Sequence, residues 1–285
     1  MKTNHAQSGQ TILLSGIPRS GTTLSCHLLN QAANTVALHE PINPSDYRVV
    51  SEPIELLSNV LDEIYQLRSN IVSGQTVNSG ATQGLSVDNP VGEQYQEGLR
   101  RSRVERGTIN IDKRIDEDFT LVVKQNAFFA ALSSQLIAHL PMVFLVRNPV
   151  DVLLSWWTVD LPVNKGHIPA GERVDKSLAS QLKSIGNVLD RQLAIYRWFC
   201  KKFTSSDATL IYYEDVIAQN GMPLFDAVGV QPPQLEEELS FKKRSYPEFA
   251  VRQLSENRDK ITSLADTGMY TANAISSAID AVCGE

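Results

Sequence analysis

Five short apolar runs recur along the chain, separated by longer segments that are polar or have helical periodicity. The runs are TILLSG (11–16), NTVALH (34–39), FTLVVK (119–124), PMVFLV (141–146) and ATLIYY (208–213). Runs of leucine and β-branched residues without regular polar alternation are typical of strands buried on both faces of a parallel sheet. The pattern therefore predicts an α/β fold with a mostly parallel central sheet flanked by helices.

Three other segments have the apolar spacing of helices. The first begins at Pro53, which suits a first helical turn, and its apolar face consists of Ile54, Leu57, Leu61, Ile64 and Leu67. The second covers residues 177–203, with an apolar stripe of Leu178, Leu182, Ile185, Leu189, Leu193 and Tyr196. The third covers residues 271–282. We expect these stripes to pack against the core.

Residues 73–118 break this pattern, because they are first glycine-rich and polar and then densely charged. They carry too little apolar surface to form core, and a plain connection of that length is uncommon in a compact domain. Two interpretations stay open, a mobile lid or substrate-facing insertion and a disordered segment. We expect residues 1–285 to form a single domain with a flexible polar insertion at about 73–118.

The composition and net charge exclude some classes of binding partner. The formal net charge is −6, which argues against the broad basic face that nucleic acids and anionic membranes require. The first ten residues are polar, and no run of about 18 apolar residues occurs. Three distant cysteines form no zinc-binding spacing and suit a reducing compartment. These features predict a cytoplasmic protein with no metal, nucleic-acid or membrane partner; the oligomeric state is left open.

The segment GIPRSGTT joins the first strand to a helix expected from TTLSCHLLNQ. Gly16 and Gly21 have the spacing of a phosphate-binding P-loop, and backbone N–H groups and the helix dipole converge on an anion at such a turn. Thr22 stands where a nucleoside-triphosphate site has its lysine, and the cation of this turn is Arg19. The expected ligand is therefore a phosphate compound other than ATP; the alternative is that the glycines serve only the geometry of the turn.

A second candidate anion site lies in RNPVDVLLS, residues 147–155. Arg147 closes a predicted strand, Pro149 and Asp151 suit the start of a helix, and Ser155 follows within that helix. Arg147 and Ser155 are expected to face one crevice at the carboxyl edge of the sheet, where arginine can bind a phosphate through two hydrogen bonds. The alternative is a purely structural arginine and serine.

These motifs resemble the sulfotransferases that use 3′-phosphoadenosine 5′-phosphosulfate (PAPS). The family's P-K/R-S/A-G-T-T loop is matched at residues 18–23, its R-N-P-x-D-x-x-x-S motif at 147–155 and its Y-E-D segment at 212–216, so that the similarity covers about residues 10–230. The resemblance implies a P-loop-like nucleotide-binding fold and PAPS as a donor that needs no metal. It implies these cofactor-binding residues: Arg19, Ser20, Gly21, Thr22, Thr23, Arg147, Ser155 and Tyr213. Arg19 would neutralise the leaving phosphate.

The general base departs from one branch of this family. The cytosolic small-molecule enzymes carry the base in a K-x-H segment, which here reads K-Q-N, so that Lys124 is retained and Asn126 replaces the histidine. The carbohydrate sulfotransferases carry a glutamate in L-F/Y-E-P, and the similar segment ALHEP offers Glu40, with His39 as the second candidate. Lys124 would assist charge neutralisation. The alternative is that Glu40 only pairs with a cation.

The sequence also departs from the family pattern at two parts of the expected cofactor site. Leu24 stands where the family often has an adenine-stacking tryptophan, and the C-terminal R-K-G segment is absent, which leaves basic residues within 241–260 as candidates. Trp156, Trp157 and the loop 158–171 are expected to form acceptor walls. The favoured acceptor is a hydroxyl of a small molecule such as a specialised metabolite, ahead of an amine. The alternatives are a carbohydrate sulfotransferase, a P-loop kinase and a nucleotide-binding protein without catalysis.

Overall fold

The computed structural model describes residues 9–47, 53–103, 105–241 and 245–284. Its central sheet is fully parallel and has the strand order β2-β5-β1-β6-β7. The strands are β1 (Thr11–Gly16), β2 (Thr35–His39), β5 (Thr120–Lys124), β6 (Met142–Val146) and β7 (Thr209–Tyr212). Each lies within one of the five predicted runs, so the predicted α/β fold with a parallel sheet is confirmed.

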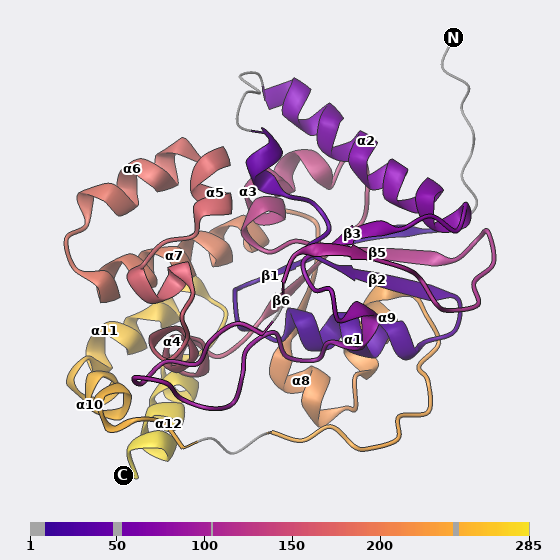
Figure 1. Ribbon diagram of the computed structural model, residues 1–285. Coiled ribbons are helices and arrows are strands. Elements are labelled where there is room, and N and C mark those ends of the chain that lie inside the picture. Colours follow the sequence, from indigo (N-terminus) through magenta and orange to yellow (C-terminus); the bar gives the residue numbers. More distant parts are fainter. Residues whose placement is uncertain (1–8, 48–52, 104, 242–244, 285) are drawn as a thin grey trace.

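Helices cover both faces of this sheet (Figure 1). One face carries α1 (Thr22–Gln31), α8 (Tyr213–Ala218) and α9 (Met222–Val228), and the other carries α2 (Pro53–Val72), α3 (Ala127–Leu136) and α7 (Val188–Thr204). Successive residues of β1 alternate between two core clusters, with Leu13 in one and Ile12 and Leu14 in the other. Because side chains alternate across a strand, continuous apolar runs fill both interfaces.

The remaining helices and 3-10 turns belong to neither of these two groups of helices. They are α4 (Pro149–Trp157), α5 (Pro169–Val174), α6 (Lys176–Ser184), α10 (Glu248–Glu256), α11 (Arg258–Thr262), α12 (Ala272–Cys283) and the 3-10 turns η1 (Pro44–Tyr47), η2 (Gly84–Ser86), η3 (Pro162–Lys165) and η4 (Ser263–Thr267). The C-terminal helices α10 and α12 contact α4 and so support the strand-to-helix segment that carries Arg147. Helix α12 confirms the helix predicted over 271–282.

Two details of the helix predictions were wrong. The segment 177–203 is not one helix, because α6 ends at Ser184 and α7 begins at Val188. Gly186 interrupts the segment, and the Asn187 side chain accepts a hydrogen bond from Asp190 N at 3.1 Å, which caps a new helix. At the start of α2, Ile54 is 79% exposed and does not join the apolar face that Leu61, Ile64 and Leu67 bury.

The insertion 73–118 contains a small antiparallel sheet of β3 (Val77–Ser79) and β4 (Gly107–Ile109). Val77, Val91 and Ile109 are buried in the larger core cluster, so the expectation that the insertion contributes nothing to the core was wrong at these positions. The Lys113 ammonium donates hydrogen bonds to three backbone carbonyls where α1 turns into β2, those of Asn30 (2.7 Å), Thr35 (2.8 Å) and Ala32. The insertion is therefore fastened to the main sheet; its flexibility stays a prediction.

Removing the Lys113 ammonium should destabilise the fold, because three carbonyls at the end of α1 would lose a charged donor. Lys113→Met is expected to lower the free energy of unfolding by about 1 to 3 kcal/mol, measured by urea denaturation. The control is Arg114→Met at an exposed neighbouring position, where a change within about 0.5 kcal/mol is expected. Equal stability of the two variants would contradict this role.

Candidate active site

The turn between β1 and α1 places backbone N–H groups at the carboxyl edge of the sheet. Arg19 (φ 74°) and Gly21 (φ 99°) both have left-handed backbone conformations, and α1 begins directly afterwards at Thr22. A Cβ atom on Gly21 would lie 2.4 Å from Cδ2 of the Tyr213 ring, so that only glycine allows this approach. The result is a helix N-terminus open to an anion, with an aromatic ring beside it.

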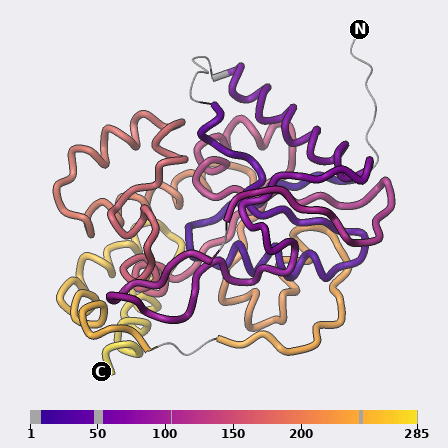
Figure 2. Tube along the Cα trace, in the orientation of Figure 1, coloured from indigo at the N-terminus to yellow at the C-terminus, as the bar shows by residue number. Residues whose placement is uncertain are grey.

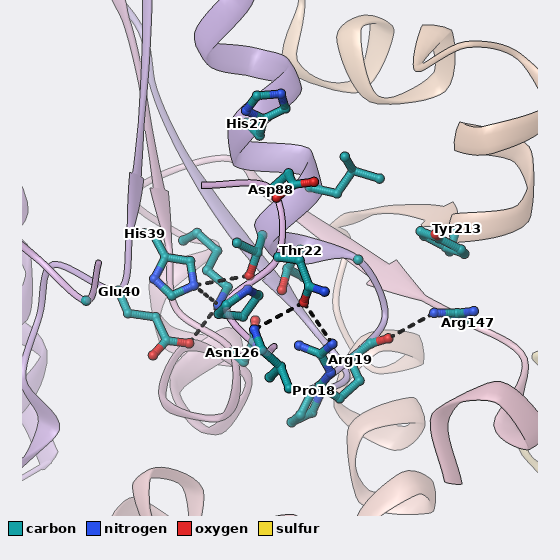
Figure 3. A pocket seen from close by; sticks show the side chains of 18 of the residues that line it. Pro18, Arg19, Thr22, His27, His39, Glu40, Asp88, Asn126, Arg147 and Tyr213 are labelled. Carbon is teal, nitrogen blue, oxygen red and sulfur yellow. Dashed lines mark hydrogen bonds and ion pairs between the residues drawn. The ribbon is translucent and has the colours of Figure 1, made fainter. Parts of the chain in front are cut away.

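A cavity of about 1050 Å³ lies over this turn (Figure 3). Nine of the eleven predicted site residues line it: Arg19, Gly21, Thr22, Thr23, His39, Glu40, Lys124, Arg147 and Tyr213. Ser20 and Ser155 do not. The Ser20 hydroxyl donates to the Leu145 carbonyl at 3.0 Å, and the buried Ser155 hydroxyl accepts from Arg19 Nε at 3.1 Å. Both serines therefore support the walls of the cavity, and any contact of their side chains with a ligand stays a prediction.

Three of these side chains form a connected cluster on one side of the cavity. Lys124 is buried at the end of β5, and its Nζ lies 2.6 Å from Glu40 Oε1 and 3.4 Å from His39 Nε2. His39 Nε2 is also 3.1 Å from the Thr23 hydroxyl of α1. His39 Nε2 thus faces the Lys124 ammonium and the Thr23 hydroxyl, whereas the buried Nδ1 has no hydrogen-bond partner among the described residues.

The electrostatics of the cluster give its two candidate bases, Glu40 and His39, different charge states at neutral pH. Burial acts to raise the pKa of Glu40, but the Lys124 charge, helped by His39 and the direct hydrogen bond, outweighs it and lowers the pKa to about 2. Burial, reinforced by the Lys124 charge, lowers the pKa of His39 to about 4. At neutral pH, Glu40 is therefore a carboxylate and His39 a neutral imidazole. The Glu40 side chain is 36% exposed, which leaves it open to the cavity.

On the opposite side of the cavity, Arg147 stacks on an aromatic ring. Its guanidinium carbon lies 4.3 Å from the centre of the Tyr213 ring, and its Nη2 is 3.3 Å from Asp151 Oδ2 in the first turn of α4. The next residue along the Y-E-D segment, Glu214, accepts a hydrogen bond from Asn148 N at 3.0 Å. The R-N-P and Y-E-D segments are thus joined to each other directly, which fixes both at the mouth of the cavity.

The prediction that Trp156 and Trp157 form acceptor walls was wrong. They are 0% and 4% exposed, and neither lines the cavity. Trp156 Nε1 donates to the Pro18 carbonyl at 2.8 Å, so this ring supports the β1–α1 turn from below instead. The loop that follows them does line the cavity, through residues 161–163 and 167–170.

Several cavity residues were not found from the sequence. The insertion supplies residues 88–91, Ser102 and Arg106, and the segment 235–241 covers the side near Tyr213. Gly80 N donates to the His39 carbonyl at 2.6 Å, which ties the insertion to the candidate bases. These contacts join residues far apart in the chain, so no local pattern marks them. Of the basic residues within 241–260, residues 242–244 lie outside the described residues, and Arg258 and Lys260 pair with Asp280 and Asp190.

Residues 10–220 match the family model of the sulfotransferase domain. The match spans most of the chain, and the protein therefore belongs to the sulfotransferase family of transferases. A comparison with curated proteins finds no match.

Two solved structures were compared with the fold. The first is the crystal structure of a sulfotransferase from Alicyclobacillus acidocaldarius, with 11% identity, a TM-score of 0.44 and coverage of 98% of this chain and 97% of that chain. The second is sulfotransferase STF1 from Mycobacterium tuberculosis H37Rv, with 14% identity, a TM-score of 0.31 and coverage of 96% and 77%. Both likenesses are remote, and the family assignment rests on the sequence match.

The described residues bear on the predictions that the protein has no membrane and no metal partner. None of their helices combines the length and apolar character needed to cross a membrane. Within the same part of the chain, no group of three or more His, Cys, Asp or Glu side chains could hold a metal ion. Independence of the reaction from metals stays a prediction.

The lowered pKa of His39 should make stability depend on pH. Between about pH 6.5 and 4 the unfolded histidine takes up a proton that the folded one does not, so stability falls as the pH falls through this window. His39→Gln should remove a slope of up to about 1.4 kcal/mol per pH unit, measured by urea denaturation from pH 7 to 4. The exposed His139→Gln is the control; if both variants keep the wild-type slope, the imidazole is not held neutral.

Proposed function

We propose that this sulfotransferase moves a sulfuryl group from PAPS to a hydroxyl group of a small-molecule acceptor. The observation that carries the proposal is that one cavity contains both an anion-binding turn with arginine in place of lysine and, at the ends of β2 and β5, a carboxylate paired with a buried lysine. The first arrangement suits a nucleotide without a γ-phosphate. The second suits an acceptor that must lose a proton.

The donor would lie across the N-terminus of α1. Arg147 would bind the 3′-phosphate, and the Tyr213 ring beside it would contact the adenine; both line the cavity, which supports this assignment. Phe241 supports this assignment, because its ring lies edge-on to Tyr213 at 6.2 Å and also lines the cavity. The 5′-phosphosulfate would then reach the turn that holds Arg19. The cavity is large enough for a nucleotide and an acceptor together.

In the transfer step, the acceptor oxygen attacks sulfur as the bond from sulfur to the bridging phosphate oxygen breaks. The electron pair stays on the 5′-phosphate of the leaving 3′-phosphoadenosine 5′-phosphate (PAP), where Arg19 and the α1 N–H groups neutralise it. Glu40 takes the hydroxyl proton. Lys124 would stabilise the sulfuryl oxygens; a charge shared with them pairs less strongly with Glu40, so the Glu40 pKa would be lowered less when the donor is bound.

The acceptor would enter beside the apolar wall of the cavity. The accessible part of this wall consists of Leu161, Pro162, Pro169 and Ala170 of the loop. Such a surface favours a hydrophobic small molecule over a carbohydrate. Localisation in the cytoplasm stays a prediction of the sequence.

Replacing Arg147 should weaken binding of the 3′-phosphate selectively. Arg147→Ala is expected to reduce PAP affinity by about 1.5 to 3 kcal/mol, or roughly 10- to 150-fold, in isothermal titration calorimetry. Adenosine 5′-phosphate, which lacks the 3′-phosphate, should bind wild type and variant nearly equally. If both nucleotides lose the same affinity, Arg147 only holds Tyr213 and Asp151 in place.

Replacing Glu40 should slow the chemical step. Glu40→Gln removes the proton acceptor but keeps an oxygen for Lys124, so kcat is expected to fall by roughly 10² to 10⁴ while PAP affinity stays unchanged. His39→Ala should cost less, because His39 Nε2 is already in contact with the Thr23 hydroxyl and the Lys124 ammonium. The reverse order of the two losses would make His39 the base, and near-full activity of both variants would place the base elsewhere.

The reaction itself can be tested by incubating the enzyme with PAPS and a panel of phenols, aliphatic alcohols, amines and sugars. Mass spectrometry should detect PAP and an acceptor that has gained one SO₃ group, first among the apolar alcohols and phenols. Sulfation of sugars alone would correct the acceptor class. Phosphorylation of an acceptor in parallel reactions with ATP, and none with PAPS, would overturn the proposal.

A further inference from the structure

The side chain of Arg19 is held between α4 and the insertion. Its Nε donates to Ser155 Oγ at 3.1 Å, and its Nη2 donates to Asn89 Oδ1 at 3.1 Å. Asn89 lies 70 residues further along the chain and lines the same cavity. The two acceptors come from different parts of the chain, α4 and the insertion, and together they restrict the orientation of the guanidinium.

The orientation of the Asn89 amide follows from its neighbours. Its Oδ1 also accepts a hydrogen bond from the backbone N–H of Val91 at 3.2 Å. A guanidinium and a backbone N–H are both donors, so the atom between them must be the amide oxygen. The hydrogen bond from Val91 N therefore fixes the orientation of the Asn89 amide, with its oxygen toward Arg19.

The chain directly after Asn89 is braced by antiparallel pairing. Val91 is 2% exposed in the core, Gly92 N donates to the Arg101 carbonyl at 2.9 Å and Arg103 N donates to the Pro90 carbonyl at 2.8 Å. Such pairing makes the loop a firm support for a side chain that points into the cavity.

The segment that returns alongside residues 90–92 is attached to the C-terminal end of α4 through Arg100. Arg100 N donates to the Thr158 carbonyl at 2.8 Å, and the buried Arg100 guanidinium donates to Thr158 Oγ1 at 3.1 Å and to Ser155 Oγ at 3.5 Å. In Figures 1 and 2 this part of the insertion crosses in front of α1 and reaches α4. The Ser155 hydroxyl, which accepts the hydrogen bond from Arg19, therefore also accepts one from Arg100 of the insertion.

We propose that Asn89 is a positioning residue that orients Arg19 for sulfuryl transfer, an inference that rests on the proposed function above. An unheld arginine loses rotamer freedom when it is ordered, and this loss would fall on the transition state, in which the leaving phosphate gains charge. Asn89 removes part of that loss in advance. The insertion thereby contributes to catalysis through a residue that need not touch the sulfuryl group.

The direct test is a double-mutant cycle with PAPS and an acceptor found in the panel. Asn89→Ala should lower kcat by roughly 10- to 100-fold, with the KM for PAPS changed less than about threefold. In an Arg19→Ala background, Asn89→Ala should cost nothing further, since there is no guanidinium left to orient. The control is Asn78→Ala, an exposed asparagine of the same insertion, which should leave all constants unchanged. Equal losses in both backgrounds would overturn the proposal.

A second readout needs neither donor nor turnover. In the ligand-free enzyme, phenylglyoxal should modify Arg19 several-fold faster in Asn89→Ala than in wild type or Asn78→Ala, as followed by peptide mass spectrometry. An unchanged rate would overturn the proposal even if Arg19→Ala is too slow for the cycle to be read. Failure of the proposed function is distinguishable, because the wild type would then not use PAPS while the difference in Arg19 labelling would remain.

Discussion

The buried charge of Lys124 is the constraint around which the site is organised. An ammonium that is 2% exposed at the end of an inner strand needs a partner, because an unpaired buried charge is strongly unfavourable. Glu40 meets this need at 2.6 Å, and it does so with a left-handed backbone (φ 46°) and its N–H bonded to the Lys124 carbonyl at 2.9 Å. The ion pair thus fixes the end of β2 against β5, and with it the position of both candidate bases. The insertion adds Gly80, whose N–H holds the intervening His39 carbonyl.

The same edge of the sheet explains how an acidic protein can hold an anion. The chain has a net charge of −6, yet Arg19, Lys124 and Arg147 all line one cavity beside the N-terminus of α1. These three cations lie where strands β1, β5 and β6 end, since the carboxyl ends of parallel strands meet there, and Glu40 and Asp151 pair with Lys124 and Arg147. A local site of this kind binds a small anion without the broad basic surface that a nucleic acid requires.

The sequence predicted the strands and the β1–α1 turn well because both depend on local patterns, apolar runs in one case and glycine spacing in the other. It failed where long-range packing decides. Trp156 and Trp157 are aromatic residues of a kind often found in pocket walls, but on α4 both side chains are buried in the core. Asn187 divides a continuous apolar stripe by capping a new helix. Asn89 and Gly80 carry no local signal, because their importance comes from contacts with Arg19 and His39 across the chain.

We propose above all that the turn between β1 and α1, which has Thr22 at the lysine position and Arg19 as its cation, binds a 3′,5′-bisphosphate nucleotide and not a triphosphate. Thermal-shift titration of the wild-type protein with PAP and with ATP plus magnesium, side by side at equal concentrations, tests it most directly. The account predicts that PAP raises the midpoint of unfolding in a saturable way and that ATP at the same concentration has little effect. A saturable shift with ATP and magnesium, and none with PAP, would contradict it.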